Sequence, residues 1–365
     1  MNDGHAGSSV PRSFAARIAA CLVSAAAGLG AAEVVARAAH RGAYPYLNLF
    51  EADARYGVRL RPDDATTVRS RDGRLTEIAT NDLGFRGPAW PQSAPQARRA
   101  LLLGDSQVLG YGVAFGDTMA ARLERRADLE ALPAAVPSWG PPESVLALAD
   151  LAPRFKPTHA VFFANAANDW FETLPNTQRT TAVDGWAAAA PATAARDFPL
   201  RGFLFGRSHL VLAVRQLVHA IGDGGPPPAA APLALEREAA RRGARPGPFR
   251  TPLAEHLARA VSVCREHGCQ VVAAALPLDV QVTASEWQKY RAAPRDMTAT
   301  EALLEDFVAD ARGLGVPAVN LLPALRAAGP GVFLPDDYHL SAAGHAVVAD
   351  ELAALLTTLD AQVKR

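Results

Sequence analysis

The sequence has few cysteines, few lysines and no excess of charge of either sign. Its 365 residues include three cysteines, and its 37 basic and 37 acidic residues give a formal net charge of zero. A neutral chain has no general electrostatic attraction to nucleic acid, so nucleic acid is not an expected partner. Charged residues form 20% of the chain and hydrophobic residues 49%. This composition excludes a disordered protein and favours a folded core.

The three cysteines do not form the pattern of a metal site. Cys21 lies in an apolar run, whereas Cys264 and Cys269 lie close together in CREHGCQ. A zinc site needs further ligands at regular spacing, and the sequence has no second cysteine pair and no regularly spaced histidines. We therefore expect no metal and no cofactor. Cys264 and Cys269 are either two small buried residues or a local disulfide, and a disulfide requires an oxidising compartment.

Long uncharged stretches are scarce, and the first one lies near the N-terminus. Residues 18–32 (IAACLVSAAAGLGAA) carry no charge and follow Arg12 and Arg17. An uncleaved signal anchor, a cleaved signal peptide and a soluble amphipathic helix all fit this pattern. We expect residues 1–40 to form a signal anchor, a single transmembrane helix. The preceding positive charge places its N-terminus in the cytoplasm and the rest of the chain on the extracytoplasmic, periplasmic or cell-surface side.

A second apolar stretch does not continue long enough to suggest another span. Residues 203–221 are interrupted by Arg207, His209 and Arg215. Charged side chains at the centre of a bilayer are costly, so this stretch is expected to form a helix packed on the protein.

Alternating strands and helices after residue 98 predict an α/β fold. Each expected strand is a short buried run, and such runs separated by helices indicate a parallel sheet covered on both faces. The expected strands lie within 99–105, 132–140, 158–169, 269–279 and 316–325, and the expected helices within 117–127, 141–155, 254–268, 298–315 and 341–359.

Two segments stand outside this alternation. Residues 41–98 form a lead-in, in which Asp72-Gly73 lies between two alternating runs and predicts a β-hairpin. Residues 170–250 contain alanine-rich, proline-rich and arginine-rich tracts. We expect an inserted helical segment and a flexible linker there, within a domain that spans 99–365.

Polar residues follow several of the expected strands. In a parallel sheet, ligands bind outside the carboxyl ends of the strands, so these residues are candidates for one site. They are Gly104, Asp105 and Ser106 after the first strand, Ser138 and Gly140 after the second, Asn165, Asn168 and Asp169 after the third, and Asp336, Asp337, His339 and His345 after the last.

A serine, a histidine and an aspartate among these residues fit nucleophilic catalysis. A serine hydroxyl needs a base, and His339 is suited to that role near neutral pH. Asp336 precedes His339 by three residues, which lets its carboxylate hold Nδ1 while Nε2 faces Ser106. Alternatively, Ser106 is only the capping residue of a turn. His345 is expected to be a packed or surface histidine.

An oxyanion formed during attack on an ester needs hydrogen-bond donors already in place. The expected donors are the backbone amides of Ser106 and Gly140 and the side-chain amide of Asn168. Asp105 is expected to bond the backbone of the turn instead of taking part in the reaction.

These blocks resemble the SGNH (GDSL-type) hydrolases in identity and order. Gly104-Asp105-Ser106 is similar to the first block, Gly140 in PSWGPPE to the second, Asn168 in NAAND to the third, and Asp336 to His339 in DDYH to the last. The resemblance implies a flavodoxin-like three-layer α/β/α sandwich and a metal-free serine esterase or acyltransferase. Ala166 departs from the usual glycine of the third block. The long stretch between Asn168 and His339 suggests a cap over the site.

The expected function follows from this site and from the anchor. The anchor together with NDLGFRG at 81–87 resembles membrane-attached bacterial members, some of which act on acylated cell-surface polysaccharides. We expect an extracytoplasmic serine esterase that removes a short acyl group, acetyl first, from a carbohydrate. An O-acyltransferase within a polysaccharide-modification machinery and a non-catalytic glycan-binding or assembly protein are the alternatives.

Overall fold

The computed structural model describes residues 12–70, 72–92, 98–190, 200–222, 230–244, 247–290 and 292–363. The chain forms two compact units. The first takes its residues from 1–43 and 198–224, and the second from 44–197 and 225–365. Residues 44–98 of the lead-in and the sheet thus belong to the second unit, whereas residues 198–224 of the expected domain belong to the first.

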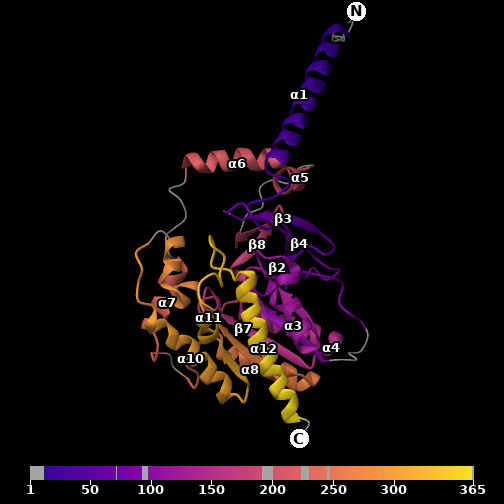
Figure 1. The fold of residues 1–365 in the computed structure, drawn as a ribbon. Helices are drawn as coiled ribbons and strands as arrows, with labels where there is room; N and C mark the ends of the chain where they lie inside the picture. The colour runs from indigo at the N-terminus through magenta and orange to yellow at the C-terminus, as the bar shows by residue number, and fades with distance from the viewer. Residues whose placement is uncertain are drawn as a thin grey trace, which may run out of the picture. The chain divides into compact units, whose positions relative to one another are not determined.

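A five-stranded parallel sheet forms the centre of the second unit (Figure 1). In chain order its strands have the spatial order 2-1-3-4-5 of flavodoxin-like sheets. The expected fold class is therefore confirmed. Across the sheet the order is β11-β10-β7-β5-β6, with bounds β5 Arg98–Gly104, β6 Leu129–Ala135, β7 His159–Asn165, β10 Gln270–Leu276 and β11 Ala318–Asn320.

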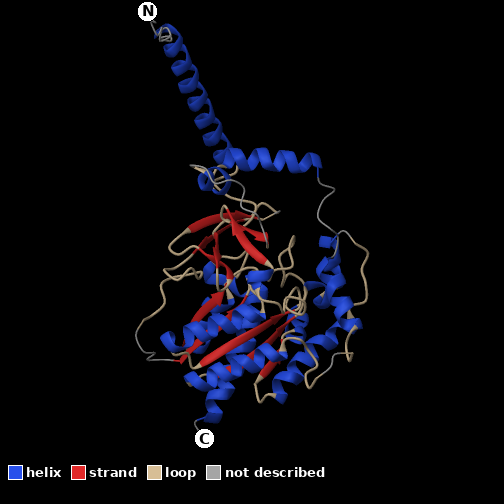
Figure 2. Cartoon of the chain, turned by 180° about the vertical axis from the view of Figure 1, so that it is seen from behind, coloured by secondary structure: helices blue, strands red, loops and turns tan. Residues whose placement is uncertain are grey.

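Helices cover both faces of this sheet (Figure 2). The chain moves from β5 to β6 in one direction and from β6 to β7 in the other, and right-handed crossovers then place the connecting helices on opposite faces. Accordingly α3 packs with α12, whereas α4 packs with α8. The helices of the domain are α2 Ser106–Leu109, α3 Met119–Ala127, α4 Pro141–Phe155, α8 Ala254–His267, α9 Asp279–Val282, α10 Thr298–Gly313, α11 Leu322–Ala328 and α12 Ala342–Val363.

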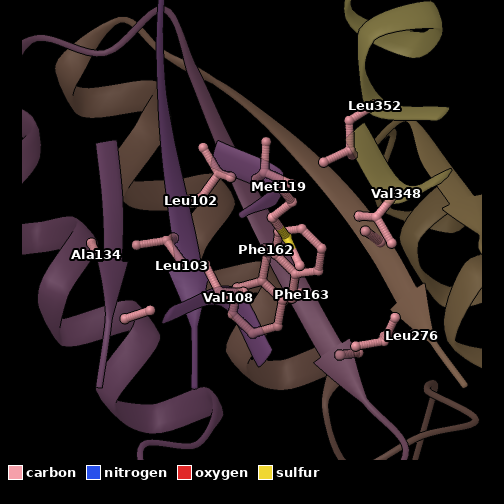
Figure 3. Packing of buried hydrophobic residues seen from close by; sticks show 14 of the residues in the cluster. Leu102, Leu103, Val108, Met119, Ala134, Phe162, Phe163, Leu276, Val348 and Leu352 are labelled. Carbon is pink, nitrogen blue, oxygen red and sulfur yellow. The ribbon is translucent and has the colours of Figure 1, made fainter. Parts of the chain in front are cut away.

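The core forms because the central strands carry unbroken apolar runs between their ends, such as residues 100–103 in β5 and 160–164 in β7. Figure 3 shows Phe162 and Phe163 of β7 beside Leu102 and Leu103 of β5, and all four are buried. Adjacent residues of a strand point to opposite faces, so an unbroken apolar run supplies both sides of the sheet.

Within the described residues, the second unit also contains three antiparallel hairpins. The hairpin expected around Asp72-Gly73 is present as β3 Ala65–Arg69 and β4 Leu75–Ala79. A second pairs β1 Phe50–Asp53 with β2 Gly57–Leu60. The third, β8 Thr180–Val183 with β9 Trp186–Ala189, lies in a stretch expected to be helical.

A local turn explains why this third hairpin forms. Asp184 and Gly185 both have positive φ, 53° and 91°. This pair of left-handed residues gives the two-residue turn that matches the twist of a hairpin, and Asp-Gly is its typical sequence. The same insertion is helical further on, as expected, in α5 Arg201–Gly206, α6 His209–Gly222 and α7 Ala230–Ala240.

Among the described residues, two helices are long and apolar enough to cross a membrane. The first lies within α1 Arg12–Ala39 and spans Ala16–Ala39, with none of its apolar window buried. The second lies within α12, where 39% of the apolar window is buried. Because α12 packs on α3, we interpret it as a core helix.

The close cysteine pair forms a disulfide between Cys264 and Cys269. It joins the last turn of α8 to the start of β10, across the Gly268 that ends the helix in the left-handed conformation. Of the two alternatives left by the sequence, the structure has the disulfide.

Candidate active site

Ser106 stands where strand β5 gives way to helix α2. It is the first residue of α2, and Asp105 is the capping residue whose carboxylate accepts from the Gln107 amide at 2.8 Å. The other Asp105 oxygen accepts from Asn165 Nδ2 at 2.8 Å, which joins the ends of β5 and β7. Ser106 is therefore not the cap of this turn, and Asp105 has the backbone role that the sequence suggested.

His339 lies on a loop that returns to this turn before α12. Its carbonyl accepts from the Leu334 amide at 2.8 Å, and Ser341 N donates to Val332 O at 2.9 Å. His339 Nε2 is 2.8 Å from Ser106 Oγ. The structure thus brings together two residues 233 positions apart in the sequence in the contact that a general base requires.

Gln107 holds the histidine loop from both sides of His339. Its side chain donates to Tyr338 O at 3.1 Å and accepts from Leu340 N at 3.0 Å. Gln107 is buried, so these bonds fix the backbone on either side of the histidine relative to the residue after the serine. The sequence contains no periodicity or spacing that marks Gln107, because its partners are backbone groups of a distant loop.

Two tyrosines enclose the imidazole ring. Tyr338 stacks on His339 with ring centroids 4.6 Å apart, and the Tyr111 ring lies at 5.0 Å. Burial raises the pKa of both phenols, so both are neutral near neutral pH. The histidine therefore works in an apolar enclosure that restricts its rotation.

The carboxylate that the structure records next to His339 is that of Asp337, whereas the sequence predicted Asp336 for this position. Asp337 Oδ1 is 3.0 Å from His339 Nδ1, although Nδ1 makes no hydrogen bond of good geometry within the described residues. Asp336 instead accepts from the Asp72 amide at 3.1 Å and lies 3.7 Å from Arg74. The hairpin turn thus provides a donor and a cation for Asp336.

The backbone N–H of Gly140, which the sequence predicted as an oxyanion donor, already has a partner in this structure. It precedes α4, and its single N–H donates to Glu143 Oε2 at 3.0 Å. Glu143 lies in the first turn of α4, so the bond is a helix-capping interaction. One backbone hydrogen cannot serve both this carboxylate and an oxyanion.

Asn168 has a second side-chain N–H besides the one that it donates to Glu172. Its Nδ2 donates to Glu172 Oε2 at 2.8 Å, and an amide nitrogen carries two hydrogens. Ser106 adds a backbone N–H in the first turn of α2, where amides have no partner within the helix. We expect the oxyanion site to consist of these two donors.

A cluster of charged residues lies next to Asn168, one of the expected oxyanion donors. Arg179 lies 3.3 Å from Glu172 and 3.6 Å from Glu143. Burial raises the pKa of both glutamates, and the Arg179 charge opposes that rise. Asp169 is also buried, and burial followed by the Asp105 charge raises its pKa.

Lys289 is a further contributor that the sequence did not indicate. Its ammonium donates to Asp337 O at 2.9 Å and lies 3.3 Å from the buried Asp279. It thereby ties the segment after β10 to the loop that carries Asp337 and His339. An isolated lysine in a polar stretch gives no sequence signal for such a role.

His345, the other histidine after the last strand, is buried away from the serine. Its Nδ1 accepts from the Met119 amide at 3.1 Å, and burial lowers its pKa to about 3. It is therefore a neutral packed residue that joins α12 to α3.

Part of the chain matches a known protein family. Residues 239–364 match the family described as "SGNH hydrolase-like domain, acetyltransferase AlgX". A search of curated proteins found no match.

Solved structures of similar fold include three esterase-type proteins. A member of the lipolytic protein G-D-S-L family from Veillonella parvula DSM 2008 is 12% identical, with 72% of this chain and 99% of that chain covered and a TM-score of 0.38. The psychrotrophic esterase EstA from Pseudoalteromonas sp. is 12% identical, with 72% and 98% covered and a TM-score of 0.37. A carbohydrate acetylesterase family member from Sinorhizobium meliloti is 13% identical, with 72% and 98% covered and a TM-score of 0.39.

None of these scores reaches 0.5, so the fold assignment rests on the strand order of the sheet and on the family match. The predicted resemblance is confirmed over residues 239–364, a range that includes the last of the four sequence blocks, because there the chain matches an SGNH hydrolase-like domain.

Proposed function

We propose that this protein is a serine enzyme that forms an acyl-enzyme at Ser106 and acts on acyl groups, acetyl first, carried by a carbohydrate. The observation that carries the proposal is the 2.8 Å contact between Ser106 Oγ and His339 Nε2. The match over residues 239–364 to a family whose description names an SGNH hydrolase-like domain and an acetyltransferase supports acyl groups as the substrate class.

The proposed reaction proceeds in two halves. Ser106 Oγ attacks the ester carbonyl while His339 Nε2 takes its proton, and the oxyanion is held by Ser106 N–H and Asn168 Nδ2–H. His339 then gives the proton to the leaving alcohol oxygen, which leaves an acyl-serine. In the second half, an incoming hydroxyl loses its proton to His339 and attacks the acyl carbon. The bond to Ser106 Oγ then breaks as His339 returns the proton to that oxygen.

Water or a sugar hydroxyl can serve as the second nucleophile. Water makes the protein an esterase, and a sugar hydroxyl makes it an O-acyltransferase. The family description names an acetyltransferase, and this is the observation that favours transfer as the second candidate.

We propose the extracytoplasmic side of the membrane as the location. The apolar α1 supports anchoring, and the Cys264–Cys269 disulfide supports an oxidising compartment. In this proposal the N-terminus remains in the cytoplasm.

The test is turnover of p-nitrophenyl acetate by the full-length protein in detergent, with Ser106→Ala in parallel. We expect the variant to lose activity by on the order of 10⁶-fold while its melting temperature stays close to that of the wild type. Equal turnover by both proteins contradicts the proposal. Mass spectrometry of an oligosaccharide acceptor, with and without the acetyl donor, then separates transfer from hydrolysis.

A further inference from the structure

Helix α6 is fastened to the C-terminal end of α1 by one carboxylate. Glu33 of α1 accepts hydrogen bonds from Ser208 Oγ at 2.7 Å and from the amides of His209 and Leu210 at 3.0 and 2.9 Å. These amides belong to the first turn of α6, where backbone donors need an outside partner. Arg37 also donates to Glu33. These hydrogen bonds explain why a charged residue, Glu33, lies within the long apolar helix α1.

Helix α6 runs crosswise to the C-terminal end of α1 (Figure 1). On one side of α6, His209 and Leu212 are buried. The other side carries Val214 and Leu217, which are 53% and 64% exposed. Residues three apart share one face of a helix, so these two side chains form an outward apolar stripe.

The preceding segment also exposes large apolar side chains. Leu200 and Phe203, before and within α5, are 72% and 51% exposed. In water such large apolar side chains are unfavourable by roughly 25 cal/mol for each Å² left uncovered. Several exposed large apolar side chains are typical of a surface that contacts a membrane or another protein.

Arginines accompany this apolar surface. Arg201 and Arg207 belong to α5 and its end, Arg215 is exposed on α6, and Arg37 lies in the last turn of α1. Arginine stems lie along apolar surface while their guanidinium groups reach polar surroundings. Apolar residues with flanking arginines are the composition of helices that lie in the headgroup region of a membrane.

We propose that α5 and α6 lie in the lipid headgroup layer, beside the point where α1 leaves the bilayer, with the Val214–Leu217 stripe turned toward the acyl chains. The occupant of this surface is the bilayer itself. Helix α1 has the length and hydropathy of a span, and its Glu33 binds the first turn of α6, the helix that carries the stripe. The inference rests on the proposed membrane location of α1 and is independent of the chemistry at Ser106.

The orientation of α6 can be measured with single fluorophores. The full-length protein with Cys21→Ser receives one new cysteine by Val214→Cys, Leu217→Cys or Gln216→Cys, is labelled with an NBD dye, and is reconstituted into phosphatidylcholine and phosphatidylglycerol vesicles. Gln216 is exposed and lies about 160° around the helix from Val214, because each residue advances about 100°. It is therefore a matched control on the same helix.

We expect blue-shifted emission at 214 and 217 and quenching by spin-labelled lipids several-fold stronger there than at 216. Equal quenching at the three positions overturns the orientation, and no quenching at any of them assigns the stripe to a protein partner instead. An intact mass that lacks residues 1–32 also overturns the proposal, because α6 would then have no anchor beside it. Repeating the measurement with Ser106→Ala keeps a failure of catalysis distinct from a failure of membrane docking.

Discussion

At the scale of single residues, the geometry around His339 is set by groups on three separate segments. Gln107 holds the backbone before and after it, Asp337 lies beside Nδ1, and Lys289 binds the Asp337 carbonyl. Each of these contacts involves a group within two residues of the histidine. The position of the His339 imidazole therefore depends on contacts to the neighbouring backbone of its loop as much as on contacts to the ring itself.

Replacement of the two aspartates distinguishes their roles. We expect Asp337→Asn to lower kcat by up to about 10⁴-fold, because the imidazole loses the carboxylate that stabilises its charged form. Asp336→Asn keeps an oxygen that can accept from the Asp72 amide, so we expect its kcat to stay within a few-fold of the wild type. Steady-state kinetics on p-nitrophenyl acetate measures both. A larger loss in Asp336→Asn returns the role to the residue indicated by the sequence spacing.

Replacement of Gln107 tests whether the loop is held from the serine side. Gln107→Leu leaves Tyr338 O and Leu340 N without their partner, and each unpaired buried group costs about 1–3 kcal/mol. We expect a lower melting temperature and a fall in the rate at which a fluorophosphonate labels Ser106. The contrary result is an unchanged labelling rate at a temperature where the variant is fully folded.

At the scale of elements, a histidine joins two helices on one face of the sheet. His345 of α12 accepts from the Met119 amide, the first amide of α3, which has no acceptor within its own helix. Only the neutral imidazole accepts at Nδ1. Burial lowers the pKa of His345 to about 3, so the ring stays neutral in the folded protein well below the usual range of histidine.

This buried histidine makes stability depend on pH. Below about pH 6.5 the unfolded chain binds a proton that the folded protein does not, so the free energy of unfolding falls as the pH falls from about 6.5 toward 3. One such group contributes up to about 1.4 kcal/mol for each pH unit. His345→Gln retains an acceptor and does not titrate. Urea unfolding at pH 7 and pH 4.5 is expected to show a smaller pH dependence in the variant, and parallel curves would argue against this role.

At the scale of the whole molecule, the chain returns to its N-terminal unit after leaving it. Residues 198–224 lie in the middle of the sequence but belong to the unit of α1, while the sheet, the serine and the histidine belong to the other. Removing the N-terminal helix alone therefore leaves part of its unit behind.

Two truncations test this division. A chain that lacks residues 1–43 keeps α5 and α6 without α1, and we expect it to aggregate without detergent, because apolar faces lose their cover. A chain that also has 198–224 replaced by a Gly/Ser linker of equal length is expected to be soluble and to label at Ser106 with a fluorophosphonate. Size-exclusion chromatography measures the first property. Aggregation of both chains would show that the second unit does not fold alone.

The sequence by itself determined the repeating strands and helices and the main site pair. Apolar runs such as the one ending at Gly104 must be covered on both faces, and helix α4 has the bounds 141–155 that its two leading prolines and apolar spacing predicted. Ser106 and His339 were identifiable because their chemistry and position at strand ends are local properties of the chain. The Asp184-Gly185 turn was also available as a local signal, although the surrounding alanines favoured helix.

Only the tertiary structure decided which partners surround these residues. Asp336 and Asp337 are adjacent, and the choice between them depends on Asp72 and Arg74 of a distant hairpin. The Gly140 amide is taken by Glu143 because helix α4 begins there. Gln107 and Glu33 act through backbone groups of segments more than 170 residues away. Such contacts depend on where separate segments meet in space, and local sequence patterns carry no information about that meeting.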